Sequence, residues 1–273
     1  DVFLKGLADD GGLFVPKSIE PFKEEELDNL KNLSYNDLAV EIIYPFIGDF
    51  MSKDNLISMI SKSYTNFRSK DVVKISDVGN LKVLELFHGP TLAFKDFAMQ
   101  LIGQFFQFSL ERRQSRVTIV GATSGDTGSA AIEAFRGLAA VDVFILYPDG
   151  RVSDVQRKQM TTPSEKNVHA LAINGHFDDC QARLKDMFND FEFRDGVNLA
   201  GVNSINWARV LAQVVYYFSS AVKLGAPNKK ISFSVPTGNF GNVLAGCYAQ
   251  QMGLPVEKLI VATNSNDILH RLF

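Results

Sequence analysis

The stretch at residues 84–113 reads LELFHGPTLAFKDFAMQLIGQFFQFSLERR, and the rest of the chain is organised around it. From Phe94 onward, apolar residues recur at the i, i+3, i+4 and i+7 spacing of a helix with one apolar face. Pro90 and Thr91 suit the start of such a helix, because proline is tolerated in a first turn and threonine can cap one. The pattern therefore predicts a helix that begins at Pro90–Thr91 and holds Lys95 in its first turn.

Lys95 is the candidate for chemistry in this stretch. The partial positive charge at a helix N-terminus disfavours an ammonium group, and Phe94 and Phe97 would remove water from it. A lysine pushed toward its neutral form is a better nucleophile and base. The alternative is a solvated surface lysine that pairs with Asp96, which is the commoner situation for lysines.

Composition limits the classes of protein that fit. The chain has 273 residues, of which 46% are hydrophobic and 22% charged, as in an ordinary soluble globular protein of one or two domains. The net charge of −3 with no basic block argues against a nucleic-acid partner. The sequence shows no signal peptide and no apolar run of the ~18 residues that a membrane helix needs. We therefore expect no membrane association and a cytoplasmic location.

The cysteines and histidines do not form a recognisable metal or disulfide pattern. Cys180 and Cys247 are the only cysteines, and the four histidines lack HxxxH or HExxH spacing, so we expect no metal. The chain opens on Asp1 and stops at Phe273, soon after what reads as a new helix start at 266–267. We therefore expect a piece of a longer protein that lacks the C-terminal part.

Two regions follow from the hydrophobic pattern. Residues 1–75 are expected to form a small helical N-terminal unit, and residues 76–273 an α/β region in which strands and helices alternate. The strands are expected at 81–87, 116–120, 141–147, 168–173, 231–235 and 259–263. The helices after the Lys95 helix are expected at 129–136, 153–160, 177–189, 206–224 and 243–252. This alternation predicts mostly parallel sheets covered by helices.

A strand that runs into a glycine-rich loop and then a helix occurs twice, at 117–131 and at 231–245. Ligands of open α/β sheets bind at the carboxyl ends of strands, and a helix start reached through glycines offers N–H groups to an anion. The second loop, TGNFGN at 237–242, has no acidic residue and is the better phosphate cradle. In the first, SGDTG at 124–128, Asp126 would repel a phosphate. A tight turn without a ligand is the alternative for each loop.

Four long motifs resemble threonine synthases of the fungal and bacterial type. They are HGPTLAFKDFA around Lys95, GATSGDTGSAAIEAFRG at 121–137, NSINWARVLAQ at 203–213 and VPTGNFGNVLAG at 235–246. GLADDGGLFVP near the start and ATNSNDIL near the end extend the likeness over nearly the whole chain. The resemblance implies a fold-type II, tryptophan-synthase-β-like enzyme whose cofactor is pyridoxal 5'-phosphate.

The resemblance also implies roles for residues around the cofactor. Lys95 would hold the cofactor as a Schiff base and, once released, would carry protons to and from the substrate. Asp126 would lie by the ring. The cofactor phosphate would be bound by Gly238, Asn239, Phe240, Gly241 and Asn242.

The implied substrate is O-phospho-L-homoserine, which reacts with water to give L-threonine and phosphate. Ser124 and Thr127 would lie by its carboxylate. Its own phosphate needs a second anion site, for which Ser204, Asn206 and Arg209 are the candidates, since arginine binds phosphate with two hydrogen bonds. Asn206 and Arg209 are three apart and are expected to share a helix face. Weaker candidates are Lys5, Arg151 and Lys158, and His88 is expected to support the Lys95 loop.

Other readings of the same residues stay open. They are a threonine-synthase-like phospholyase, another fold-type II enzyme such as a hydroxyamino-acid dehydratase, and a non-catalytic binding or signalling protein on this fold. The family contacts the ring nitrogen with a group late in the chain, which we expect beyond Phe273. The expected oligomeric state is a monomer or a homodimer.

Overall fold

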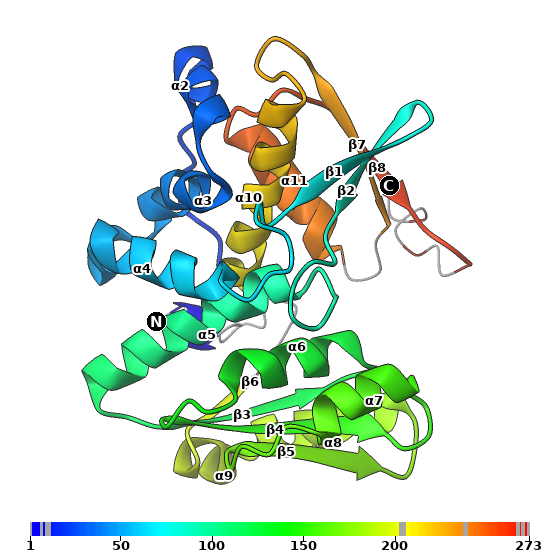
Figure 1. The fold of residues 1–273 in the computed structure, drawn as a ribbon. Coiled ribbons are helices and arrows are strands. Elements are labelled where there is room, and N and C mark those ends of the chain that lie inside the picture. Colours follow the sequence, from blue (N-terminus) through cyan, green and yellow to red (C-terminus); the bar gives the residue numbers. More distant parts are fainter. Residues whose placement is uncertain are drawn as a thin grey trace. The chain divides into compact units, whose positions relative to one another are not determined.

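The computed structural model describes residues 2–5, 8, 12–201, 206–236, 240–265, 268 and 271. The chain forms two compact units, each built from several segments (Figure 1). Unit 1 comprises residues 1–14, 62–68 and 86–206, and unit 2 comprises residues 15–61, 69–85 and 207–273. The expected domain boundary at residue 75 is a division along the sequence and stays a prediction.

Unit 1 is built on a parallel sheet in the order β5-β4-β3-β6. Its strands are β3 (Val117–Ala122), β4 (Val141–Pro148), β5 (Val168–Ile173) and β6 (Leu199–Gly201). Val117 pairs with Val141, and Val143 pairs with Val168. Strands covered on both faces read as nearly continuous apolar runs, as VTIV and VFIL do here.

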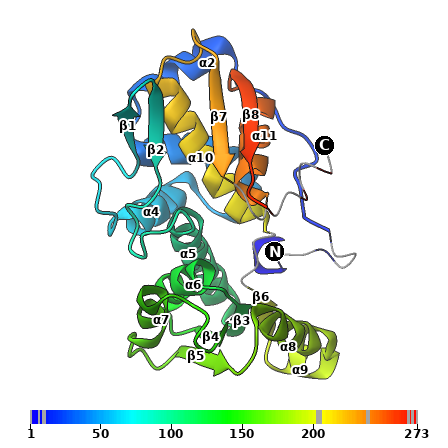
Figure 2. The same ribbon diagram turned by 90° about the vertical axis from the view of Figure 1, so that its right-hand side faces the viewer.

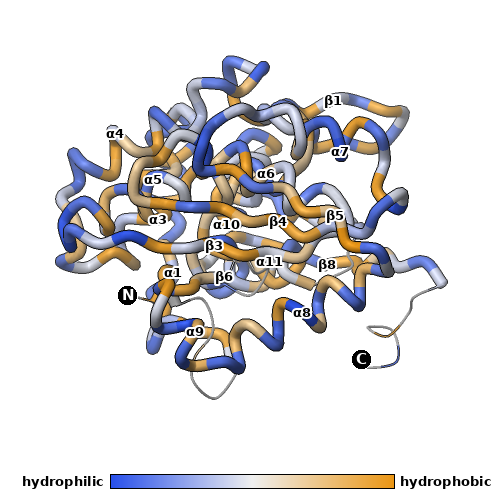
Figure 3. Tube along the Cα trace, turned by 90° about the horizontal axis from the view of Figure 1, so that it is seen from below, coloured by the Kyte–Doolittle hydropathy of each residue, from blue (hydrophilic) through white to orange (hydrophobic). Residues whose placement is uncertain are grey.

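Helices cover both faces of this sheet. On one face, α6 (Asp126–Phe135) contacts β4, while α5 (Asp96–Arg113) and α7 (Asp154–Thr161) pack against α6. On the other, α8 (Phe177–Asn189) packs on β3 and β4, and α9 (Phe191–Gly196) follows it. Cys180 of α8 is buried with Val120 and Leu146. Figure 3 shows α8 alternating between hydrophobic and hydrophilic residues as it crosses this face. The layers form an α/β sandwich.

Unit 2 is organised by a buried helix, α10 (Trp207–Lys223), in which every side chain from Ala208 to Val222 is buried. A helix that is buried all round forms the centre of a core. It packs against α11 (Gly241–Gln251) and α3 (Tyr35–Ile43). The parallel strands β7 (Ile231–Pro236) and β8 (Val256–Ala262) lie side by side (Figure 2). Tyr217 of α10 meets Phe233 of β7 with ring centroids 4.8 Å apart.

The N-terminal part supplies the remaining elements. A short helix, α1 (Val2–Lys5), belongs to unit 1. Then come α2 (Glu24–Asn29), α3 and α4 (Lys53–Tyr64), with the single turns η1 (Leu30–Asn32), η2 (Tyr44–Phe46) and η3 (Gly48–Phe50). An antiparallel hairpin follows, formed by β1 (Lys74–Val78) and β2 (Leu81–Glu85). The helical character expected for this region is present, whereas β1 was not expected.

The predicted start of the Lys95 helix is wrong. The helix begins at Asp96 rather than at Pro90–Thr91, and Lys95 is its N-cap residue. Leu92 adopts φ +64°, a left-handed conformation that no helix can include. The backbone N–H and the hydroxyl of Thr91 both donate to the Asp96 carboxylate, so residues 91–95 fold as a loop.

The predicted starts of the two helices that follow the glycine-rich loops are also wrong. α6 begins at Asp126, three residues before the predicted 129, and α11 begins at Gly241, two residues before 243. β5 and α8 have the predicted bounds. Within the part of the chain that the structure describes, no helix is both long enough and apolar enough to cross a membrane.

Candidate active site

Lys95 lies between a loop and a helix, half-buried rather than solvated. Its ammonium nitrogen Nζ stands 5.5 Å from the centroid of the Phe94 ring. Phe97 instead faces the core, where its ring meets that of Phe67 at 4.9 Å. The amine therefore contacts the Phe94 ring and not that of Phe97, and its expected shift toward the neutral form stays a prediction.

The alternative of a surface ion pair between Lys95 and Asp96 does not describe this structure. The Asp96 side chain is fully buried and accepts hydrogen bonds from the Thr91 backbone nitrogen at 2.9 Å and from Thr91 Oγ1 at 2.7 Å. Burial raises the pKa of Asp96, and the Thr91 hydrogen bonds partly offset this rise. A Cβ on Gly89 would lie 2.4 Å from Asp96 Oδ2, so only glycine lets the loop close around the carboxylate.

The Asp126 loop (residues 123–128) follows the carboxyl end of β3 and is held from within. Thr123 Oγ1 accepts hydrogen bonds from the backbone nitrogens of Gly125 at 3.0 Å and Gly128 at 2.9 Å. Gly125 has φ +146°, and a Cβ there would lie 2.3 Å from Gln156 Oε1. Gln156 Nε2 donates to Asp126 Oδ1. Two backbone N–H groups of the loop are thus bound by its own Thr123, and the Asp126 carboxylate is held by α7.

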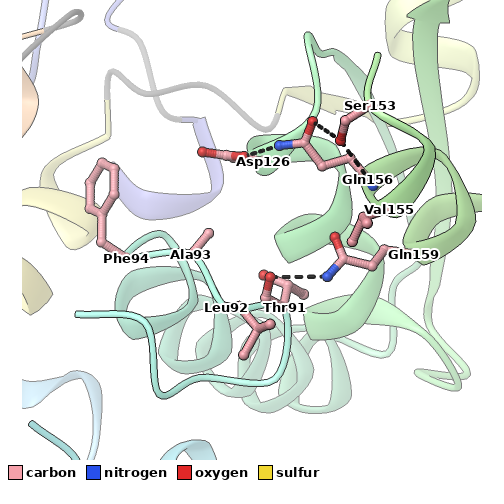
Figure 4. A pocket seen from close by; sticks show the side chains of 9 residues that line it. All are labelled: Thr91, Leu92, Ala93, Phe94, Asp126, Ser153, Val155, Gln156 and Gln159. Atoms are coloured by element: carbon pink, nitrogen blue, oxygen red, sulfur yellow. Dashed lines mark hydrogen bonds between the residues drawn. The ribbon is translucent and has the colours of Figure 1, made fainter. Parts of the chain in front are cut away.

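A pocket of about 380 Å³ in unit 1 lies beside these loops (Figure 4). Its lining comes from the loop before Lys95, from the start of α6 and from α7, and consists of Thr91, Leu92, Ala93, Phe94, Asp126, Ser153, Val155, Gln156 and Gln159. The structure therefore brings Asp126 together with the residues directly before Lys95. Ser124 is exposed and Thr127 half-buried, and neither lines this pocket.

Sequence reasoning missed the α7 side of the pocket. Gln159 Nε2 donates to the backbone oxygen of Thr91 at 3.0 Å, across 68 residues of sequence. Ser153 caps α7 and donates to Gln156 Oε1 at 2.9 Å. Gln156 and Gln159 are three apart on α7 and so share a face. The three-residue spacing could have indicated that both glutamines face the same side, but nothing in the sequence pointed to Asp126 and Thr91 as their partners.

The Phe240 loop (residues 237–242) leads from β7 to α11. Gly238 and Asn239 lie outside the described residues. Phe240 has φ +60° and is the N-cap of α11, and Gly241 is its first residue. Asn242 Oδ1 accepts a hydrogen bond from the Tyr216 hydroxyl at 2.6 Å, and the Tyr217 hydroxyl lies 2.9 Å from the Asn242 backbone oxygen and 3.1 Å from Oδ1. Burial raises the pKa of both tyrosines, so they remain neutral donors. The Asn242 side-chain oxygen therefore fastens α11 to α10.

The candidates for the second anion site differ in their surroundings. Ser204 lies outside the described residues. Asn206 precedes α10 rather than lying in it, so the expected shared helix face with Arg209 is wrong; its amide nitrogen donates to the Phe3 oxygen at 2.8 Å. Arg209 is only 3% exposed, and burial lowers its pKa to about 10. Its guanidinium stays positive at neutral pH in surroundings that favour a bound anion.

The weaker candidates have no part in the described pocket. Arg151 and Lys158 are exposed, and the side chain of Lys5 is not among the described ones. His88 is half-buried; its backbone oxygen accepts from the Arg68 nitrogen at 2.7 Å and its ring packs on Phe87. This backbone bond ties down the segment before Gly89, while the expected support by the His88 ring stays a prediction.

Comparison with known proteins gives the family. Residues 74–273 match the model described as pyridoxal-phosphate dependent enzyme, and residues 1–64 match that of the threonine synthase N terminus. The chain belongs to the pyridoxal-phosphate dependent enzyme family. The expected fold-type II α/β class and the expected cofactor class are thereby confirmed.

Individual relatives are similar over nearly all of the chain. A threonine synthase from Pseudomonas aeruginosa is 53% identical across 99% of the chain and 58% of its own length. A crystal structure of threonine synthase with bound pyridoxal phosphate from Brucella melitensis is 54% identical, with a TM-score of 0.95 over 99% of this chain and 58% of that one. Threonine synthase-like 2 from mouse is 42% identical across 97% of the chain and 56% of its own length. The chain thus spans rather more than half the length of these relatives.

Proposed function

We propose that this chain is part of a threonine synthase, a carbon–oxygen lyase that converts O-phospho-L-homoserine and water into L-threonine and phosphate with pyridoxal 5'-phosphate. The observation that carries the proposal is Lys95, which directly follows the loop lining a pocket that also contains Asp126. The 53% identity to a threonine synthase supports the reaction type.

The residues present suit the cofactor. The pocket volume of about 380 Å³ lies within the range of small-molecule sites, and the lysine segment forms one of its walls. When bound, pyridoxal phosphate supplies an electron sink for charge that develops on the substrate. Lys95 would hold it covalently through Nζ, and Asp126 would contact the ring. The Phe94 ring, whose centroid lies 5.5 Å from Nζ, packs beside the amine that would make this attachment.

The cofactor phosphate would be held at the start of α11. A helix N-terminus reached through glycines suits an anion, so Gly238, Asn239, Phe240, Gly241 and Asn242 are proposed as the cradle. Asn242 would contribute through its backbone, because its side-chain oxygen receives the Tyr216 and Tyr217 hydroxyls.

Lys95 would also move protons on the substrate. Released from its covalent attachment, the Nζ amine would take the proton from the substrate Cα and return protons later. Ser124 and Thr127 would bind the substrate carboxylate, and Ser204, Asn206 and Arg209 its phosphate. A charged donor already in place stabilises a phosphate that leaves with negative charge. We give Arg209 the largest share, because its buried charge is screened least by water.

The test is a product assay on the purified full-length protein with pyridoxal phosphate and O-phospho-L-homoserine. Threonine and phosphate formed in equal amounts are expected. Phosphate accompanied by a keto acid would instead indicate the phospholyase alternative. Neither product would overturn both.

The remaining properties are proposals of lesser detail. They are a cytoplasmic location, a monomeric or homodimeric state and no nucleic-acid partner. Sedimentation of the purified protein, with and without nucleic acid, tests the last two, and cell fractionation tests the first.

A further inference from the structure

Asp96 is the one acidic side chain that is buried within the described part of the chain, and its relative exposure is 0%. Removing a carboxylate from water is costly unless hydrogen bonds compensate. The residue is also next to Lys95, yet it has no role in binding the cofactor or the substrate as proposed above. A costly group beside the reactive lysine calls for an explanation.

The Asp96 carboxylate organises the loop that precedes Lys95. One oxygen accepts from the Thr91 nitrogen at 2.9 Å and the other from Thr91 Oγ1 at 2.7 Å. The loop between them makes the left-handed turn at Leu92 and ends at Lys95. Gly89 leaves the space that this arrangement needs, because any larger residue there would place a Cβ atom against the Asp96 carboxylate.

Thr91 is held from its other side as well. Its backbone oxygen accepts from Gln159 Nε2 of α7 at 3.0 Å. Its donors thus face Asp96 and its acceptor faces α7, and Thr91 itself lines the pocket. A loop fixed at both sides of one residue can hold the following segment, including Lys95, in a single position.

We propose that Asp96 is a positioning residue that acts through Thr91 to hold the Lys95 loop against the pocket. The inference rests on the proposed function in one respect, the attachment of the cofactor to Lys95. It gives Asp96 no contact with the cofactor. Its effect is to present Nζ in a geometry from which the covalent bond forms quickly.

If Asp96 had only a structural role, its substitution would have a different effect. The substitution would lower the stability and the amount of folded protein, but bound cofactor would still become attached to Lys95 at the normal rate. The two possibilities separate when cofactor binding and covalent attachment are measured independently.

The experiment follows attachment over time in the full-length protein. Pyridoxal phosphate is added, samples are quenched with borohydride at successive times, and the modification of the Lys95 peptide is quantified by mass spectrometry. Total bound cofactor is measured in parallel by equilibrium dialysis, and the melting temperature reports folding. The variants are Asp96→Asn, Thr91→Val and the conservative Thr91→Ser.

Asp186→Asn serves as the matched control, because this aspartate is exposed on α8. We expect Asp96→Asn and Thr91→Val to slow attachment about 10- to 100-fold, as for the loss of a hydrogen bond to a charged group. Thr91→Ser and Asp186→Asn should keep the wild-type rate. Total binding should change by less than the attachment rate does.

Attachment at the wild-type rate in folded Asp96→Asn and Thr91→Val would overturn the inference and leave the proposed function intact. If Asp96→Asn does not fold, the Thr91→Val and Thr91→Ser pair decides, since both keep the carboxylate. No attachment to Lys95 in the unaltered protein would instead contradict the proposed function, and the inference with it.

Discussion

The two strand–loop–helix segments share a sequence pattern, but different groups fasten them. In the Asp126 loop, Thr123 takes the N–H groups of Gly125 and Gly128, and Gln156 fixes the carboxylate. In the Phe240 loop, tyrosines of α10 fix the Asn242 side-chain oxygen, an acceptor. The first loop is therefore fixed from within by its own threonine, whereas the end of the second is fixed by tyrosines of a neighbouring helix. Glycine-rich loops of similar sequence can thus differ in the groups that hold them.

Among substitutions that test the difference between the two loops, Thr123→Val is expected to have the largest effect on the free energy of unfolding. The substitution keeps the shape but removes the acceptor for two buried N–H groups of the Asp126 loop. Each unsatisfied buried donor costs about 1–3 kcal/mol, so the loss of the acceptor for both should lower the free energy of unfolding by about 2–6 kcal/mol. Urea denaturation measures this. A loss below about 0.5 kcal/mol would show that Thr123 does not hold the loop.

Glycine-to-alanine substitutions give a matched pair across the two loops. Gly125→Ala places a Cβ at 2.3 Å from Gln156 Oε1 with φ at +146°, and should cost about 1–3 kcal/mol. A Cβ added at Gly241, the first residue of α11, has no other atom within 4 Å. Gly241→Ala should therefore raise the free energy of unfolding by about 1 kcal/mol or less. Thermal unfolding without cofactor compares them, and equal losses would contradict the different construction of the loops.

Removing the tyrosine hydroxyls tests how α11 is fastened. Tyr216→Phe should cost about 0.5–1.5 kcal/mol, because it deletes the donor 2.6 Å from Asn242 Oδ1 while the ring stays buried. Tyr248→Phe is the control, because Tyr248 also lies on α11 and its ring packs on that of Trp207 at 4.9 Å. The cofactor affinity of Tyr216→Phe should fall as well if the α11 start binds the phosphate. An unchanged affinity would separate the two roles.

The carboxylates near the first loop predict a dependence on pH that the second loop lacks. Burial, and to a lesser extent the charge of Asp126, raises the pKa of Asp96 above the value of about 3.9 that it has in the unfolded chain. Between these two pKa values the folded protein keeps a proton that the unfolded chain has lost. Stability from this group is therefore lost as pH rises through that window, by at most about 1.4 kcal/mol per pH unit.

Asp96→Asn should remove the contribution of this group to the pH dependence of the free energy of unfolding. Denaturation at a series of pH values from about 4 upward would measure that dependence. Glu133, whose pKa is also raised by burial, remains in the variant and sets the background. An unchanged slope would mean that Asp96 does not titrate in this range.

Local patterns predicted the bounds of β5 and α8 correctly. Both elements are only partly buried, and apolar and polar residues at regular spacing define them. The exposed strand β1, with the sequence KISDV, carries no such pattern, and its partner β2 determines it. The three-residue strand β6 is likewise defined by pairing with β3.

The candidate site could be predicted only in part. The sequence singled out Lys95 and Asp126 as candidates, and the structure places Asp126 in one pocket with the residues before Lys95. The helix start was placed at Pro90–Thr91 because nothing in the sequence shows that Asp96 accepts both Thr91 donors. The bond from Gln159 to Thr91 joins positions 68 residues apart, and no local signal reports such a contact. Long-range polar contacts are set by the tertiary fold, so the supporting residues were missed.

The most direct test of the account is to locate the residue that holds the cofactor. The full-length protein is incubated with pyridoxal phosphate, reduced with borohydride, digested and mapped by mass spectrometry. Modification of Lys95 is expected, and it should disappear in Lys95→Ala while other lysines stay unmodified at low cofactor concentration. Modification at another lysine, or none at all, would contradict the assignment of Lys95 as the reactive residue.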